Sequence, residues 1–120
     1  MYIVLFVLHD YEKLEDLLDA WEEVGVRGAT ILRSSGMGRV RQMALRDDLP
    51  LIPSLDALFE HEEYLNRTLF TVVDEEAMID RLVDVTQGVV GDLSQPETGF
   101  LVVLPALRAY GLNKEYAQKE

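Results

Sequence analysis

The sequence predicts a single small α+β domain, and three observations lead to this prediction. Short apolar segments that suit β-strands recur along the chain, two amphipathic helical segments separate them, and a long irregular stretch divides the chain into two β-α-β halves. This order is that of a split β-α-β plan, in which two helices cover one face of a single antiparallel sheet. A length of 120 residues with 48% hydrophobic content suits one continuous core.

The first half contains the clearest elements. Residues 2–8 are a continuous apolar run, which is typical of a central strand covered on both faces. Residues 12–24 are predicted as a helix, with Asp10 available as its N-cap and Gly25 placed to end it. Its apolar stripe consists of Leu14, Leu17, Leu18 and Trp21. Residues 26–34 are expected to form the second strand, because β-branched residues recur there and glycines follow.

Residues 40–67 are predicted to be an excursion from the sheet. Pro50 and Pro53 disfavour regular elements in its middle, but Ser54 can cap a short helix with one apolar face. That face would consist of Leu55, Leu58, Phe59 and Leu65. An apolar face on a short helix must pack against something, so these four residues are a candidate partner-binding surface.

The second half repeats the pattern of the first. Residues 68–73 are predicted as the third strand, and a helix capped by Asp74 is expected to follow through residue 86. Its buried stripe would use Met78, Ile79, Leu82 and Val83. Glycines and a proline then mark an irregular stretch before the fourth strand, residues 100–104. The domain is therefore expected to span residues 1–112, with a polar tail over residues 113–120.

Composition excludes several classes of protein. The net charge of −11 argues against a nucleic-acid partner, because affinity for phosphate backbones comes from Lys and Arg. Without cysteine there is no disulfide, no thiolate metal site and no catalytic thiol, which favours a cytoplasmic location. The longest N-terminal apolar run is too short to insert into a membrane. No spacing of His9 and His61 or of paired carboxylates indicates a metal site, and no motif indicates catalytic residues.

Two glycine segments carry a resemblance to a known family. The run of residues 25–30 followed by Gly36-Met37-Gly38-Arg39 resembles the nitrogen regulatory PII signature, in which a Gly-aromatic-Gly-Arg turn opens the T-loop. Residues 87–92 are similar to the PII B-loop, which contacts nucleotide phosphates. The resemblance covers nearly the whole chain. It implies a ferredoxin-like βαββαβ sandwich with two helices on one face, assembled as a homotrimer that acts in signal transduction and nitrogen regulation.

The resemblance also implies where an effector would bind, namely in clefts between subunits that could hold ATP, ADP or AMP. The effector-binding candidates are Gly36, Met37, Gly38, Arg39, Arg41, Gln87, Gly88, Val89, Gly91 and Arg108. Glycines allow close backbone approach to a phosphate, and Arg donates to it bidentately. From the residues alone, the segment 36–39 is equally consistent with an ordinary turn, whereas a turn is the favoured interpretation of residues 87–92. For some of the arginines, surface pairing to the many acidic side chains is favoured over ligand binding.

The chain departs from the family pattern at three positions. Val89 stands where the family has a phosphate-binding Lys, Leu93 replaces a B-loop glycine, and Arg108 lacks a neighbouring second Arg. Three functions therefore remain open. The leading one is a PII-like regulatory protein that binds a small effector and controls an unidentified partner protein, without enzymatic activity. The second is a protein-interaction module that has lost nucleotide binding, and the third is a small enzyme whose residues meet only in space.

Overall fold

The computed structural model describes residues 1–38, 41 and 65–112. In chain order its elements are β1 (Tyr2–Leu8), the short 3-10 helix η1 (Tyr11–Lys13), α1 (Leu14–Glu23), β2 (Thr30–Ser34), β3 (Asn66–Val73), α4 (Glu76–Val90) and β4 (Gly99–Pro105). The described residues thus form an α+β domain with a four-stranded sheet and two long helices, which confirms the predicted class. The short helix expected around residue 55 and the tail over residues 113–120 lie outside the described residues.

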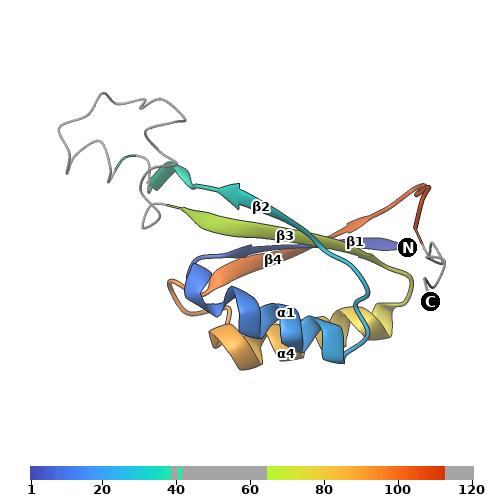
Figure 1. Cartoon of the computed structure of the whole chain (residues 1–120), viewed down its shortest axis with the longest axis horizontal. Coiled ribbons are helices and arrows are strands. Elements are labelled where there is room, and N and C mark those ends of the chain that lie inside the picture. Colours follow the sequence, from blue (N-terminus) through green and yellow to red (C-terminus); the bar gives the residue numbers. More distant parts are fainter. Residues whose placement is uncertain (39–40, 42–64, 113–120) are drawn as a thin grey trace, which may run out of the picture.

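The four strands form a sheet in the order β2-β3-β1-β4, with every neighbouring pair antiparallel. One row of paired residues crosses the whole sheet, from Arg33 in β2 through Arg67 and Leu8 to Gly99 in β4. At the opposite end, Tyr2 pairs with both Val73 and Pro105. Figure 1 shows α1 and α4 together on one side of this sheet, an arrangement compatible with the ferredoxin-like plan.

The hydrophobic core lies between the sheet and the two helices. Alternate residues of β1 point into it, and Val4, Phe6 and Leu8 have no exposed surface. The rest of the buried cluster comes from both helices and from β3: Leu17, Trp21, Leu69, Val73, Leu82 and Val90. The indole N–H of Trp21 donates to the Thr86 hydroxyl at 2.9 Å, so the polar atom of the largest buried side chain is satisfied across the two helices.

The first helix ends at Gly25, as predicted. Gly25 has φ +108°, its N–H donates to the Glu22 carbonyl, and the N–H of Val26 donates to the Trp21 carbonyl at 3.0 Å. This pair of hydrogen bonds is a Schellman cap, which reverses the chain sharply. The predicted start of the second strand at Val26 is therefore wrong. The chain needs residues 26–29 to return to the sheet, where the Thr71 hydroxyl donates to the Gly28 carbonyl at 2.6 Å.

The second helix differs from the prediction at both ends. Its N-cap is Glu75 rather than Asp74, and no side-chain hydrogen bond caps it. The helix continues beyond residue 86 to Val90, because Thr86 and Val90 are buried on the same face as Leu82. It ends where the N–H of Gly91, at φ +95°, donates to the Gln87 carbonyl.

The other face of the sheet is apolar but carries no described helix or strand over it (Figure 1). Side chains alternate along each strand, so the residues between the core positions point to this face. We call this surface the open face; its apolar residues are Ile3, Leu5, Val7, Leu32, Phe70, Val72, Phe100, Val102 and Leu104. Phe100 is 52% exposed and Leu32 is 50% exposed. Within the described part of the chain, no helix combines the length and apolarity needed to cross a membrane.

Candidate functional site

The end of β2 and the start of β3 carry two groups of polar side chains, one on each face of the sheet. On the open face, the Thr68 hydroxyl lies 2.8 Å from that of Ser34, and Ser34 donates to the side-chain carbonyl of Asn66. Because Ser34 has one hydroxyl proton and gives it to Asn66, Thr68 must be the donor to Ser34. This chain of hydrogen bonds fixes the two strands where the excursion begins and ends.

On the helix-covered face, the same strand ends carry two arginines. Arg33 and Arg67 are directly opposite each other in the β2–β3 register, so their side chains leave the same face. The Arg67 guanidinium lies over the ring of Tyr11, with its central carbon 5.4 Å from the ring centroid. The sequence alone indicated neither Arg67 nor Tyr11. Arg33 and Arg67 come together through the β2–β3 register, and the register of two strands cannot be read from one sequence.

The predicted T-loop base is only partly described. Gly36, Met37 and Gly38 follow β2 directly, and Met37 and Gly38 have helical conformation. A Cβ atom built on Gly36 or Gly38 would meet nothing within 4 Å, so the described chain itself does not require glycine there. Met37 is 73% exposed and Arg41 is also exposed. Arg39 lies outside the described residues.

The predicted B-loop is not a loop over most of its length. Gln87, Gly88 and Val89 belong to the last turn of α4, which corrects the expectation of an irregular segment. Gly88 lies on an exposed helix surface with open space around it. The helix continues through this glycine because the cost of about 1 kcal/mol relative to Ala is small beside the burial of Thr86 and Val90.

The turn after α4 uses its own backbone donors. The N–H of Leu93 donates to the Gln87 side chain at 3.1 Å, that of Ser94 to the Asp92 carboxylate at 2.9 Å, and that of Gln95 to the Asp92 carbonyl. The hydrogen bonds from the Ser94 N–H and hydroxyl also hold the pKa of Asp92 below its ordinary value. The amides are thus occupied, and an ionised carboxylate lies beside them. Both facts favour the interpretation of this segment as a turn rather than an anion-binding concavity.

The candidate effector residues that the structure describes do not converge within one chain. The C-terminal end of α4 and the segment 36–38 lie at the same end of the sheet, but next to opposite edge strands, β4 and β2. Three strand spacings separate these edges, which amounts to about 14 Å. Arg108 lies at the other end, three residues after Pro105, the partner of Tyr2. One chain thus brings Arg33, Arg67 and the segment 36–38 together, and leaves Arg108 apart.

The candidate partner-binding helix is also largely outside the described residues, which applies to Leu55, Leu58 and Phe59. Leu65 is described, and it differs from the expectation. It lies in no helix, directly precedes β3, and is fully buried. Strand β3 begins two residues earlier than predicted, at Asn66, so Leu65 belongs to the approach to the sheet and not to a helical face.

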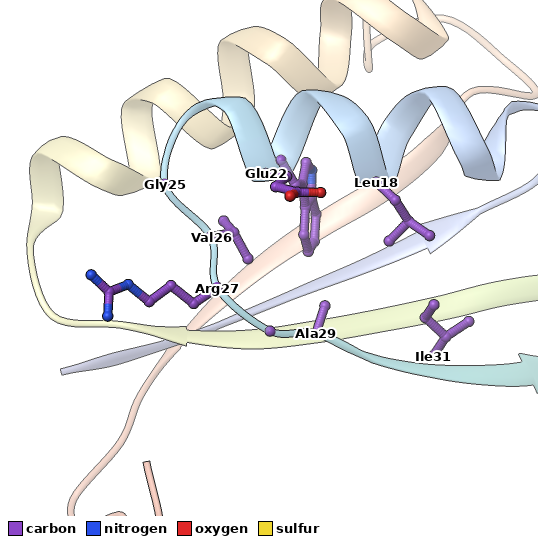
Figure 2. Close-up of a pocket in the computed structure, with 9 residues that line it drawn as sticks. Leu18, Glu22, Gly25, Val26, Arg27, Ala29 and Ile31 are labelled. Atoms are coloured by element: carbon purple, nitrogen blue, oxygen red, sulfur yellow. The ribbon is translucent and has the colours of Figure 1, made fainter. Parts of the chain in front are cut away.

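An open groove runs between α1 and the edge strand β2 (Figure 2). Leu18, Val26, Ala29 and Ile31 supply its apolar lining, and the charged side chains along it are Glu22 and Arg27. Arg27 extends away from Leu18 and Ile31 in Figure 2, so the groove has an apolar surface with a charged end. Of the residues that were predicted to bind an effector and that the structure describes, none lines this groove.

Among residues 1–38, 41 and 65–112, no three His, Asp or Glu side chains are grouped in a way that could hold a metal ion. Comparison with models of known protein families gave no match, and comparison with curated proteins gave no relative. The features of the chain that bear on function are therefore the geometry of the sheet, its open face and the strand ends beside the excursion.

Proposed function

We propose that the chain is a ferredoxin-like regulatory protein of the PII type, which self-associates and binds a small effector between subunits. The observation that carries the proposal is the sheet: its order is β2-β3-β1-β4, its helices cover one face, and its other face is apolar. An apolar face of this extent is usually covered by another protein surface. Copies of the same chain can cover it in a closed ring, and the proposed assembly is a homotrimer.

The separation of the effector candidates supports a site between subunits. Arg108 and the segment 36–38 lie at opposite ends of one sheet, so they can share a ligand only if Arg108 comes from a second copy. Glycines at positions 36 and 38, which the described chain does not itself require, leave room for a ligand to approach the backbone. The proposed effectors are the adenine nucleotides ATP, ADP and AMP. The response to the effector would pass through residues 40–67 to a partner protein.

A second function, an interaction module without nucleotide binding, is favoured by a specific observation. The amides after α4 are taken by Gln87 and Asp92, and the Asp92 carboxylate would repel a phosphate brought to them. Val89, in the last turn of α4, offers no cation in their place. In this case the assembled protein would act only as a docking platform.

Calorimetric titration of the full chain with ATP, ADP and AMP separates these two functions. We expect saturable binding that is weakened at least about tenfold by Arg39→Ala and by Arg108→Gln, because each change removes a charged donor to phosphate. Arg81→Gln is the matched control, since Arg81 is exposed on α4 and donates to its own helix at the Ala77 carbonyl. Absence of binding to all three nucleotides would overturn the sensor function and leave the interaction module.

A further inference from the structure

Residues 106–112, which we call the projecting segment, leave the sheet directly after β4. The N–H of Ala106 donates to the Met1 carbonyl at 3.0 Å, and Figure 1 shows the chain continuing from there past the end of the sheet. Leu107 is 94% exposed and Tyr110 is 85% exposed, more than any other large hydrophobic residue that the structure describes. These two side chains add almost nothing to the core of their own chain, so they present apolar surface to another molecule.

The groove between α1 and β2 offers apolar surface of the matching kind. Leu18 lines it from α1, Ala29 and Ile31 line it from the strand side, and Figure 2 shows these side chains along the same groove. Ile31 remains exposed although its register partner in β3, Leu69, is fully buried. The reason is its position in β2, an edge strand beyond which no further described strand lies. The groove is thus the part of the helix-covered side that the described chain leaves open.

Charge favours this groove over the open face as the place where the projecting segment binds. Arg108 is the only charged residue of the segment, whereas α1 contains five acidic residues and no basic one. The four strands that form the open face contain no Asp or Glu. Copies of a chain with net charge −11 repel one another, so they associate most favourably where a basic segment meets an acidic surface.

The acidic surface lies on the α1 side of the groove. Glu15, Asp19 and Glu22 follow the i, i+4, i+7 spacing that places them along one side of the helix, and Glu22 lines the groove itself. The basic residues nearby belong to the other side: Arg27 is at the end of the groove, and Arg33 is two residues after Ile31 in β2. Arg108 of a bound segment is therefore expected to lie along α1.

A projecting segment cannot fill the groove of its own chain. It follows β4, whereas the groove borders β2, and these strands are the two opposite edges of the sheet. Three strand spacings, about 14 Å, separate them. The exposure of Leu107 and Tyr110 agrees with this separation.

We propose that the projecting segment of one copy binds in the α1–β2 groove of a second copy, with Leu107 and Tyr110 against its apolar lining. This inference deepens the proposed self-association and rests on it. Each copy gives a segment and receives one, so the contact is heterologous and closes into a ring when the rotation between copies permits. It also places Arg108 on a second copy, as the proposed effector site requires.

Disulfide cross-linking of the full chain tests this contact, because the natural sequence contains no cysteine. Ala29→Cys places a thiol in the groove, and Ala109→Cys places one in the projecting segment while leaving Leu107 and Tyr110 unchanged. On mild oxidation, we expect this double variant to form covalent dimers and trimers on a denaturing, non-reducing gel. The matched control is Ala77→Cys with Ala109→Cys, since Ala77 is exposed on α4, and its yield should be at least about tenfold lower.

Removal of the two apolar side chains provides a second measurement. Leu107→Ser with Tyr110→Ser should raise the concentration at which the assembly half-dissociates at least about tenfold, as measured by light scattering. The same two changes should bring the cross-linking yield of the Ala29→Cys pair down to that of the control. Circular dichroism should remain unchanged, because both side chains are exposed in the single chain.

Equal cross-linking of the two cysteine pairs would overturn the proposal. So would an assembly of three chains whose dissociation is unaffected by Leu107→Ser with Tyr110→Ser, and this result would leave the proposed self-association standing. The mass of one chain at every concentration would overturn both together. The groove contact and the proposed function can therefore fail separately.

Discussion

The two faces of the sheet have similar side chains but different surroundings. On one face, Val4, Phe6 and Leu8 are completely buried beneath α1 and α4. On the other, the residues between them and their partners in β4 are apolar too, yet Val102 and Leu104 are each 41% exposed. Burial of apolar surface stabilises a fold by about 25 cal/mol per Å², so one face holds the chain together and the other is available for assembly.

The apolar second face of the sheet is the basis for the proposed self-association. A strand pattern with one polar face would have sufficed for a protein that stays monomeric. The chain instead places apolar side chains on β4 at Phe100, Val102 and Leu104, where no described element covers them. We infer that copies of the chain cover this face.

The largest expected effect comes from the covered face. Phe6→Ala should lower the free energy of unfolding by about 3–5 kcal/mol, because it leaves a cavity beneath both helices. Urea denaturation measures this loss. Phe100→Ala is the same truncation on the open face. Its effect on the free energy of unfolding should depend on protein concentration, because Phe100 lies on the surface that copies of the chain are proposed to cover. A loss below about 1 kcal/mol at Phe6 would contradict the assignment of the core.

A charge on the open face tests the other half of the comparison. Val102→Lys should dissociate the assembly, since an unpaired ammonium group cannot be buried in an apolar interface without a large cost. Light scattering of the variant should give the mass of one chain. Ala77→Lys adds the same charge at an exposed position of α4 and should leave the assembly intact. An unchanged mass for Val102→Lys would show that the interface lies elsewhere.

A smaller effect should follow from strengthening the helix layer. Gly88→Ala should raise the free energy of unfolding by about 0.5–1 kcal/mol, because Gly88 lies in an exposed helical turn with space for a Cβ atom. Thermal unfolding followed by circular dichroism measures the change. Gly25→Ala is the contrasting variant and should destabilise, since φ is +108° there. A loss of stability in Gly88→Ala would restore the loop interpretation of this segment.

The smallest effect concerns the turn that joins the helix layer to β4. The folded pKa of Asp92 lies below its ordinary value because Ser94 donates to the carboxylate through N–H and hydroxyl. The ionised group therefore contributes stability above the unfolded pKa of about 3.9, and this contribution is lost as the pH falls through the folded pKa. Asp92→Asn should lower the melting temperature slightly at pH 7, and the gap should close below about pH 4. A gap that does not change with pH would refute this assignment.

Much of the fold could be predicted because the periodicity of apolar residues carries it. The stripe containing Leu17 and Trp21 and the run over residues 2–8 correspond to α1 and β1. The boundaries failed where a local signal competed with packing. Gly88 resembled the end of a helix, but burial of Thr86 and Val90 extends α4 past it. The residues after Gly25 resembled a strand, but the Schellman cap turns the chain first.

Less of the candidate site could be predicted, because it depends on strand register. Arg33 and Arg67 are far apart in sequence and meet only through the antiparallel pairing of β2 with β3. The glycine motif at residues 36–38 directly follows β2 and so lies at this same end of the sheet. The second glycine motif, around Gly91, was less informative, since the amides beyond it are occupied by the chain itself.

Coverage of the open face by copies of the chain is the central claim, and the mass of the assembly in solution tests it most directly. Size-exclusion chromatography with light scattering on the full chain is the measurement, over a range of protein concentrations. The proposed assembly predicts the mass of three chains, with dissociation on introducing Val102→Lys. The mass of one chain at every concentration would contradict the claim, and with it the site between subunits.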